Sequence, residues 1–540
     1  MKVNTIAAPL SLVVPSVLAT PQPVTFESKC ADLTRSFTAP DTKVLIAKYV
    51  PKGTNITFPE SANNTCPKFV VTLADICRLT LNVSTSETSS VIVESFMPKD
   101  WESKGKRFLM TGNGGLGGCV PYSDLAFGSS LGFATIGHNN GHAGDTGVPF
   151  YNRPQVVVDY VWRALYTAGK IGKRAVASFY TSNISKSYYM GCSSGGRQGM
   201  KAAQDFPEEY DGILSVAPAI NYEGIQAAAS RLFKITGKPG DATFLNLEQW
   251  IRVHKMVVDQ CDWIDGVLDE VIEDPTKCIP RPEALLCETG QSWESHQCLT
   301  PTQVDTVRKF YEPVYGTNGE YIASRLQPLT REWIGFRFYY GGVASYLSEQ
   351  WYQYAIFNDP TWSLTNNWTI STTEYTLKKN LHNVQTFNTN LTALKSHGTK
   401  LLHYHGTADC LISSENSYDY YNGVSRTMGL KSSQLDEFYR FFPISGMDHC
   451  YSGNGAWYLG GPVQYNTPGA LDIDPNDSVL MKMVDWVEGG KAPEKLVGKK
   501  LVDGKVLGER GHCKYPAKTK YKGSGNPDLA SSWTCENSQF

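Results

Sequence analysis

The chain has 540 residues, with 50 Lys and Arg against 52 Asp and Glu, and a formal net charge of −2. A chain of this length is expected to form a large core with a substantial insertion. Its balanced charge gives no indication of a nucleic-acid or anionic-membrane partner. Aromatic residues make up 12% of the chain, which ordinary packing and a protein that handles rings or sugars would explain equally well.

The N-terminus predicts an extracellular protein. Lys2 precedes an apolar run too short to span a bilayer, and Val17-Leu18-Ala19 resembles a signal-peptidase site. We therefore interpret residues 1–19 as a secretory signal peptide, and no later segment is apolar enough for a membrane helix. Sequons for N-glycosylation occur at Asn55, Asn63, Asn82, Asn183, Asn367, Asn390 and Asn476. The 13 cysteines fit an oxidising compartment, and their odd number leaves at least one outside an intrachain pair.

Short apolar runs bounded by glycine and proline alternate with helical patterns in two parts of the chain. Such alternation predicts an α/β fold with a mostly parallel sheet. Strands are expected within residues 89–98, 107–115, 132–139, 187–196, 212–219, 400–409 and 438–446, and helices within 155–172, 193–206 and 477–490.

The middle of the chain breaks this rhythm. Residues 220–395 carry four cysteines and several Trp and Tyr, and they lack strand alternation. We expect them to form a large cap, or lid, inserted into a catalytic core made of residues 20–219 and 396–540.

A nucleophilic serine is predicted at Ser193. It stands in the pattern G-x-S-x-G with Gly191 and Gly195, a pattern that is weak by itself in a glycine-rich chain. The expected strand before it and helix after it supply the strand–turn–helix setting in which the motif exposes a serine hydroxyl.

Asp409 and His449 are the candidates for the carboxylate and the base that such a serine requires. Each follows a predicted strand, so both side chains are expected in the crevice beyond the carboxyl ends of the sheet. The order Ser, Asp, His is that of α/β-hydrolases. Any single histidine is more often structural than catalytic, but strand position, chain order and the neighbouring Cys450 favour His449.

An oxyanion hole would take one backbone N–H from Ser194, the residue after the nucleophile. The second donor is expected in the glycine-rich loop that follows an earlier strand, at Gly114 or Gly115. The sequence does not choose between these two glycines, and a plain glycine-rich turn is the alternative interpretation.

A cysteine stands beside each of the two residues that a serine hydrolase most needs. Cys192 precedes Ser193, and Cys450 follows His449. If the serine and histidine share a hydrogen bond, their neighbours come within disulfide range. We therefore expect a Cys192–Cys450 bond that fixes the histidine loop to the nucleophile turn.

These motifs resemble the tannase and feruloyl esterase family of secreted hydrolases, most closely its fungal type B feruloyl esterases. The resemblance rests on "GNGGLGGC", "GCSSGGRQG", "ISGMDHC" and "MVDWVEGGKAPE" and extends over almost the whole chain after the signal. It implies an α/β-hydrolase fold with Ser193 as nucleophile, Asp409 as acid and His449 as base.

The resemblance also implies a structural Ca²⁺ in the cap, at "CDWIDGVLDEVIEDPTKC". Carboxylates would come from Asp262, Asp265 and Asp269, and main-chain carbonyls from Val267 and Val271, since Ca²⁺ prefers hard oxygen ligands. Without the resemblance this segment is interpreted as a solvated acidic turn.

Five further disulfides are implied by the same resemblance. They pair Cys30–Cys77, Cys66–Cys119, Cys261–Cys278, Cys287–Cys298 and Cys513–Cys535. Cys410, directly after Asp409, is left unpaired and departs from the family pattern; its simplest interpretation is a small buried apolar residue.

The resulting hypothesis is a secreted serine esterase that hydrolyses hydroxycinnamate esters, such as ferulate esters of small alcohols or of plant cell-wall polysaccharides including xylan. A tannase acting on gallate esters, or an esterase for another aromatic acid, keeps the same fold and triad. A calcium-stabilised binding protein without activity is opposed by the intact triad, and a peptidase lacks a peptide-groove signature. Pocket depth, which the sequence does not give, separates ferulate from gallate; oligomeric state is equally hidden.

Overall fold

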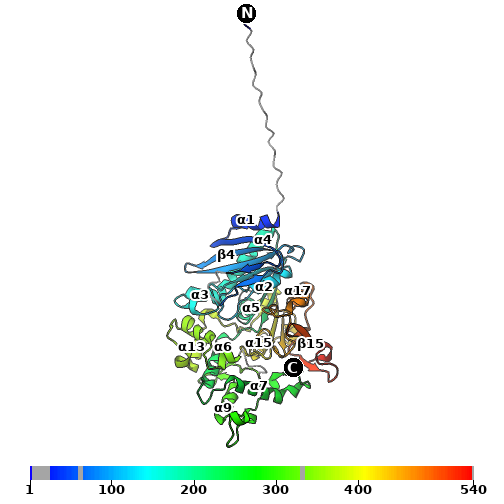
Figure 1. Cartoon of the computed structure of the whole chain (residues 1–540). Coiled ribbons are helices and arrows are strands. Elements are labelled where there is room, and N and C mark those ends of the chain that lie inside the picture. The colour runs from blue at the N-terminus through cyan, green and yellow to red at the C-terminus, as the bar shows by residue number, and fades with distance from the viewer. Residues whose placement is uncertain (3–24, 59–64, 329–334, 538–540) are drawn as a thin grey trace.

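The computed structural model describes residues 1–2, 25–58, 65–328 and 335–537 (Figure 1). The predicted signal peptide, apart from its first two residues, and the sequon at Asn63 lie outside these ranges. No helix within them is both long enough and apolar enough to span a membrane.

A nine-stranded sheet forms the centre of the core, in the order β1-β4-β5-β7-β6-β8-β9-β12-β13. The strands are β1 (Thr42–Val50), β4 (Ile76–Ser86), β5 (Ser89–Pro98), β6 (Arg107–Thr111), β7 (Ala134–His138), β8 (Lys186–Cys192), β9 (Gly212–Val216), β12 (Lys400–Gly406) and β13 (Tyr439–Ile444). The first four strands in this order pair antiparallel, and the strands from β7 to β13 pair in parallel. This is the mixed sheet of an α/β-hydrolase.

The parallel strands read as continuous apolar runs because helices cover both faces of the sheet. β7 and β9 are buried at every residue, and all seven predicted strands are present. The sequence analysis missed β1 and β4. Polar side chains, such as Lys48 in β1 and Arg78 in β4, interrupt their apolar pattern.

Helices flank the sheet on both faces. The predicted helix within 155–172 is longer than expected: α3 (Pro154–Val158) continues through the π-turn η2 (Asp159–Arg163) into α4 (Ala164–Tyr180). α4 ends where Thr181 adopts a left-handed conformation. α5 (Ser194–Asp205) and α17 (Val479–Gly489) lie where the sequence predicts them, and α2 (Tyr122–Ser130) and α15 (Glu415–Met428) complete the layers.

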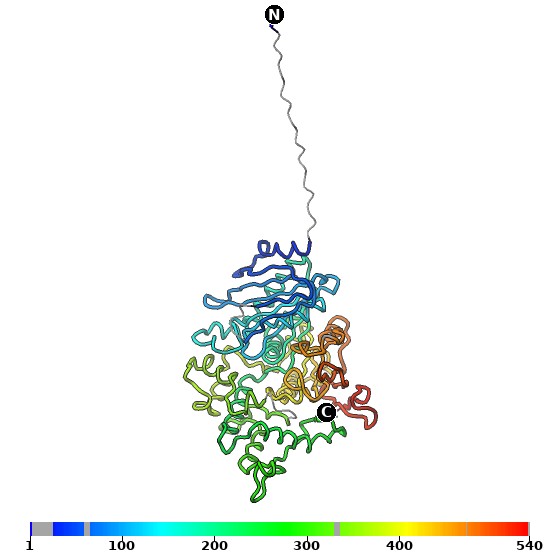
Figure 2. The backbone as a smooth tube through the Cα atoms, in the orientation of Figure 1, coloured from blue at the N-terminus to red at the C-terminus, as the bar shows by residue number. Residues whose placement is uncertain are grey.

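The segment between β9 and β12 gathers at one end of the molecule, drawn in green in Figures 1 and 2. Its main helices are α6 (Tyr222–Thr236), α7 (Leu247–Cys261), α9 (Pro301–Phe310), α11 (Tyr346–Gln350), η8 (Trp351–Ile356) and α13 (Ile370–Lys379). It has an apolar cluster of its own around Trp250, Phe310 and Tyr340, and a second cluster around Trp351 that includes core residues. A short helix, α14 (Thr392–His397), returns the chain to the core beside α5.

After α17 the chain forms two hairpins that the sequence analysis did not predict. β14 (Lys495–Val502) pairs with β15 (Lys505–Cys513), and β16 (Lys518–Tyr521) pairs with β17 (Trp533–Glu536). The structure joins the six expected cysteine pairs. Cys410 is a free thiol and is buried within the apolar cluster around Trp250, Phe310 and Tyr340.

Candidate active site

Ser193 occupies the sharp turn between β8 and α5. Its backbone has φ 64° and ψ −120°, a conformation that costs free energy and is concentrated at functional sites. The Ser193 N–H donates to Val216 O at 3.0 Å, which ties the turn to the next strand. A Cβ on Gly191 would lie 2.7 Å from the Gly195 backbone, so the crowding of this turn explains both glycines of the motif.

Asp409 and His449 meet beyond the carboxyl ends of β12 and β13. His449 Nδ1 lies 2.7 Å from Asp409 Oδ2, and His449 shares the cavity of Ser193. The predicted order of nucleophile, carboxylate and histidine along the chain therefore becomes one cluster in space.

Asp409 is fully buried and accepts four hydrogen bonds. Its Oδ1 accepts from the N–H groups of Leu411 and Ile412, both at 2.9 Å. Its Oδ2 faces His449 and, at 3.1 Å, Nε2 of His405. Burial by itself would raise the pKa of Asp409, but the two histidines outweigh it and hold that pKa well below its usual range.

His405 was missed by the sequence analysis. It lies on β12, four residues before Asp409 and two after His403. The alternation "HYH" could have indicated it, because residues two apart on a strand face the same side of the sheet.

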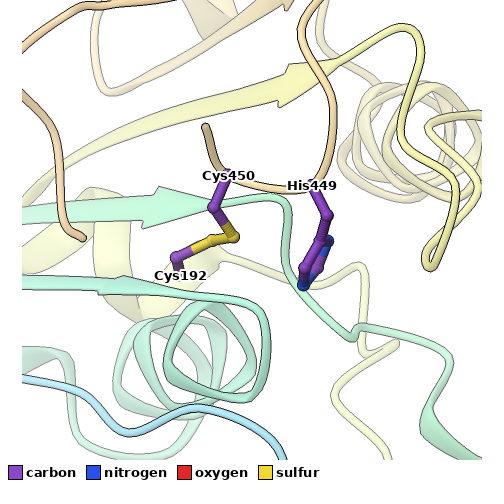
Figure 3. A group of neighbouring side chains, drawn as sticks. All are labelled: Cys192, His449 and Cys450. Atoms are coloured by element: carbon purple, nitrogen blue, oxygen red, sulfur yellow. A yellow bond between two sulfur atoms is a disulfide. The ribbon is translucent and has the colours of Figure 1, made fainter. Parts of the chain in front are cut away.

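The Cys192–Cys450 disulfide lies beside the His449 ring, between the turn after β8 and the loop after β13 (Figure 3). Its Cα atoms are 6.2 Å apart. Cys450 has φ 68°, and Ser193, the residue after Cys192, has φ 64°. Among the described residues, these two sulfurs and a His449 ring nitrogen form a group of possible metal ligands within 4.8 Å. Because the sulfurs are bonded to each other, we interpret this group as the covalent tether.

The glycine-rich loop after β6 reaches the same place. Gly115, with φ 55°, lines the cavity together with Ser193 and Ser194, whereas Gly114 is not among the lining residues. The hydroxyl of Ser194 donates to Gly115 O at 2.8 Å. Of the two glycines between which the sequence does not choose, Gly115 is therefore the one that lines the cavity.

The cavity beside Ser193 has mainly apolar walls from the core and the cap. It is lined by Gly115, Leu116, Ser193, Ser194, Ala219, Tyr222, Ile225, Gln226, Tyr339, Leu347, Leu411, Ile412 and His449. Gln226 is the one carboxamide in this lining, and its Oε1 accepts from Ser348 at 2.8 Å. A larger cavity, about 970 Å³, lies between α15 and the C-terminal hairpins and contains none of the triad, so chemistry favours the smaller one.

The five residues of the expected calcium loop follow α7. Asp262 accepts from the N–H of Glu270 and Val271, each at 3.1 Å, and Asp269 accepts from the same Val271 N–H at 3.2 Å. Asp265 accepts from Val267 N–H at 2.9 Å, and its other oxygen, Oδ2, is buried without a hydrogen-bond partner.

These carboxylates fit a hard cation. Burial raises the pKa of Asp265 to about 6, and the neighbouring carboxylates add to this rise; a bound cation would relieve both effects. Arg510 already neutralises part of this negative charge, because its guanidinium contacts Asp269 and lies 3.1 Å from Glu273.

The described sequons differ in exposure. Five asparagines are exposed, namely Asn55, Asn183, Asn367, Asn390 and Asn476. Asn82 is half-buried on β4 between two neighbouring strands, and its Oδ1 is fully buried.

Comparisons with known proteins agree with this fold. The family described as "Tannase and feruloyl esterase" matches residues 77–536. Probable feruloyl esterase B of Emericella nidulans is 44% identical over 94% of this chain and 95% of its own length. Probable feruloyl esterase B-1 of Aspergillus flavus is 41% identical over 95% and 96%.

Solved structures extend the comparison to three dimensions. The crystal structure of feruloyl esterase B from Aspergillus oryzae is 40% identical and superposes with a TM-score of 0.89, covering 95% of this chain and all of that one. Tannin acyl hydrolase from Aspergillus niger, 18% identical with a TM-score of 0.73 and covering 95% of each chain, shares the fold. The chain belongs to the tannase and feruloyl esterase family.

Proposed function

We propose that this ester hydrolase is a secreted feruloyl esterase that cleaves hydroxycinnamate esters of small alcohols or plant cell-wall sugars through a serine acyl-enzyme. The observation that carries the proposal is the convergence of Ser193, His449 and Gly115 on one cavity, with Asp409 hydrogen-bonded behind the histidine. The names of the relatives support the acyl group.

In this mechanism Ser193 Oγ attacks the ester carbonyl while His449 takes its proton. The tetrahedral oxyanion is stabilised by the N–H groups of Ser194 and Gly115. As the intermediate collapses, His449 passes the proton to the departing alcohol oxygen. Water then attacks the acyl-enzyme with His449 again as base, which releases the acid and restores the Ser193 hydroxyl.

The cavity supports an aromatic acyl group. Its apolar walls suit a ring, and Gln226 offers a polar contact for a ring oxygen. Its volume of about 40 Å³ is far below the roughly 300–1,000 Å³ of small-molecule sites. We therefore expect cap side chains at its rim, such as Leu347 and Tyr339, to move when substrate enters.

The test is hydrolysis of methyl ferulate, methyl caffeate, methyl gallate and a short aliphatic ester by purified protein. We expect the highest kcat/KM for the hydroxycinnamates. Ser193→Ala should lower kcat by about 10⁴-fold or more while far-UV circular dichroism and Tm stay unchanged. A strong preference for gallate would make the protein a tannase, and near-normal turnover by the folded variant would refute the triad.

We also propose that Asp262, Asp265 and Asp269, with the carbonyls of Val267 and Val271, hold a structural Ca²⁺. The unpartnered Asp265 oxygen supports this assignment, and the ion would stabilise the cap without taking part in the chemistry. Chelation should lower Tm by several degrees, and added Ca²⁺ should restore it, since an ion that binds only the folded state stabilises it.

Asp265→Asn provides the matched control for the calcium proposal. It should show a lowered Tm that no longer responds to EDTA, with kcat at 25 °C close to normal. An unchanged Tm of the wild type after exhaustive chelation would refute the site, and an immediate loss of turnover at constant Tm would refute its structural role.

A further inference from the structure

A chain of hydrogen bonds runs from Asp409 away from the cavity into the core. His405 Nε2 lies 3.1 Å from Asp409 Oδ2, and His405 Nδ1 lies 2.6 Å from Ser417 Oγ. Ser417 Oγ lies 2.9 Å from His403 Nε2, and His403 Nδ1 lies 3.0 Å from the Tyr439 hydroxyl. All five residues are fully buried, so each bond is sheltered from water and each unmade one would be costly.

The two acceptors that face His405 Nε2 determine which atom donates in each of these hydrogen bonds. His405 Nε2 faces two acceptors, the Asp409 carboxylate and, at 3.1 Å, Ile412 O, so Nε2 carries a proton and donates. In a neutral ring His405 Nδ1 must then accept, and the Ser417 hydroxyl donates to it. Ser417 Oγ in turn accepts from His403 Nε2–H, and His403 Nδ1 accepts from the Tyr439 O–H.

If every donor and acceptor in this series were reversed, fewer polar atoms would have a hydrogen-bond partner. The reversed series would need a doubly protonated His405 in a fully buried position, with Ser417 donating to His403 and His403 donating to Tyr439. The hydroxyl proton of Tyr439 would then have no acceptor among the described residues. Burial also lowers the pKa of His403 far below its usual value, which agrees with a neutral His403 ring.

We propose that His405 is a positioning residue of this active site, its tautomer locked by Tyr439, His403 and Ser417, and that its Nε2–H holds Asp409 ionised and aimed at His449. The inference deepens the proposed function and rests on it. Without His405, the Asp409 carboxylate would keep three of its four donors and could rotate about its side-chain torsions.

Other titratable groups near Asp409 could also affect the pH dependence of activity. Among the described residues, His449 and His405 are the titratable groups that share a hydrogen bond with the Asp409 carboxylate, and Tyr439 on β13 lies at the far end of the series. Tyr339 and Cys410 lie nearby, and burial together with the Asp409 charge raises the pKa of each. Ser417 comes from α15, so the hydrogen bonds join three successive elements, β12, α15 and β13.

The first experiment compares His405→Leu with His405→Gln, whose amide N–H can occupy the place of Nε2–H. We expect Leu to lower kcat by about ten- to a hundredfold, as small misplacements of catalytic groups do, with KM little changed. The acidic limb of the kcat/KM profile should move to higher pH, because an Asp409 with one donor fewer stabilises the imidazolium of His449 more. Gln should restore most of kcat and the native profile.

Two variants further along the chain separate positioning from stability. Ser417→Ala should reduce kcat less than His405→Leu, because it frees the tautomer but keeps the ring. Tyr439→Phe, which removes the last donor of the series, should reduce kcat less than Ser417→Ala because two hydrogen bonds still separate it from His405. Equal kcat and identical pH profiles for wild type, Leu and Gln would overturn the proposal, and so would a Leu variant whose only change is a lower Tm.

The second measurement does not depend on turnover. In ¹⁵N-histidine-labelled protein, with His405→Gln used for assignment, the resonances of His405 should report a protonated Nε2 and an unprotonated Nδ1. The opposite tautomer would overturn the proposal even if activity were normal. Conversely, failure of Ser193→Ala to abolish hydrolysis would refute the proposed function while leaving the tautomer result in place.

Discussion

Two residues in strained backbone conformations frame the reacting groups. Ser193 has φ 64° and Cys450 has φ 68°, and neither is glycine. Such conformations persist only where surrounding structure imposes them. At Ser193 the hydrogen bond to β9 supplies that constraint, and at Cys450 the disulfide to Cys192 does so across a sequence separation of 258 residues.

Removing this disulfide should therefore reduce the rate beyond its effect on stability. We expect the Cys192→Ala/Cys450→Ala double variant to lose about tenfold or more in kcat at a temperature where it is folded, because His449 is no longer fixed relative to Ser193. Steady-state kinetics beside a melting curve would measure the two effects separately.

The matched control is Cys513→Ala/Cys535→Ala, which removes a disulfide from the C-terminal hairpins. It should lower Tm and leave kcat unchanged. Equal kcat losses in both double variants would contradict a specific catalytic role for Cys192–Cys450, as would peptide mapping that found both of its thiols free.

At the scale of elements, α6 connects the substrate cavity to the cap. Tyr222, Ile225 and Gln226 on this helix line the cavity, and Glu223 points the other way into the cap. Trp351 Nε1 donates to Glu223 Oε1 at 3.1 Å, while Oε2 is buried without a partner. Burial raises the pKa of Glu223 to about 7, so the carboxyl group is most stable when protonated.

This raised pKa predicts that the stability of the cap depends on pH. The folded state binds the Glu223 proton more tightly than the unfolded state, whose pKa is near the ordinary 4.5. Its contribution is fully present below about pH 4.5 and is lost as the pH rises through 7, with a magnitude on the order of 2–3 kcal/mol. Tm should therefore fall from pH 5 to pH 8.

Glu223→Gln tests this assignment, since the amide is neutral at every pH. Its Tm should change less between pH 5 and pH 8 than that of the wild type, and its advantage should be largest at pH 8. A wild-type and a variant curve that run parallel over this range would show that another group causes the dependence.

At the scale of the whole molecule, glycosylation should follow exposure and not sequence pattern alone. If the protein is secreted, glycans are expected at the exposed asparagines, such as Asn183 and Asn390, because the transferase needs an accessible side chain. Asn82 is held in β4 with Oδ1 buried and should remain unmodified. Glycopeptide mapping of protein from a fungal host measures the occupancy of each site, and a fully occupied Asn82 would contradict this.

Much of the core was predictable because its signals are local. A parallel strand buried on both faces shows as a short apolar run, and a nucleophile turn needs Gly191 and Gly195 within a few residues of Ser193. Chain order then selects Asp409 and His449, and the adjacent cysteines indicate their link. β1 and β4 escaped prediction because polar side chains interrupt their apolar pattern.

What the tertiary structure decided depends on contacts between side chains of different elements. The chain through His405, Ser417 and Tyr439 joins two strands and a helix, and no local pattern encodes that they meet. The cap's apolar clusters and the shape of the substrate cavity arise in the same way, from side chains brought together by packing. The sequence by itself determined the family, seven of the nine strands of the sheet and the candidate triad. The folded chain decided which buried groups contact Asp409, because only close packing removes water and makes each hydrogen bond obligatory.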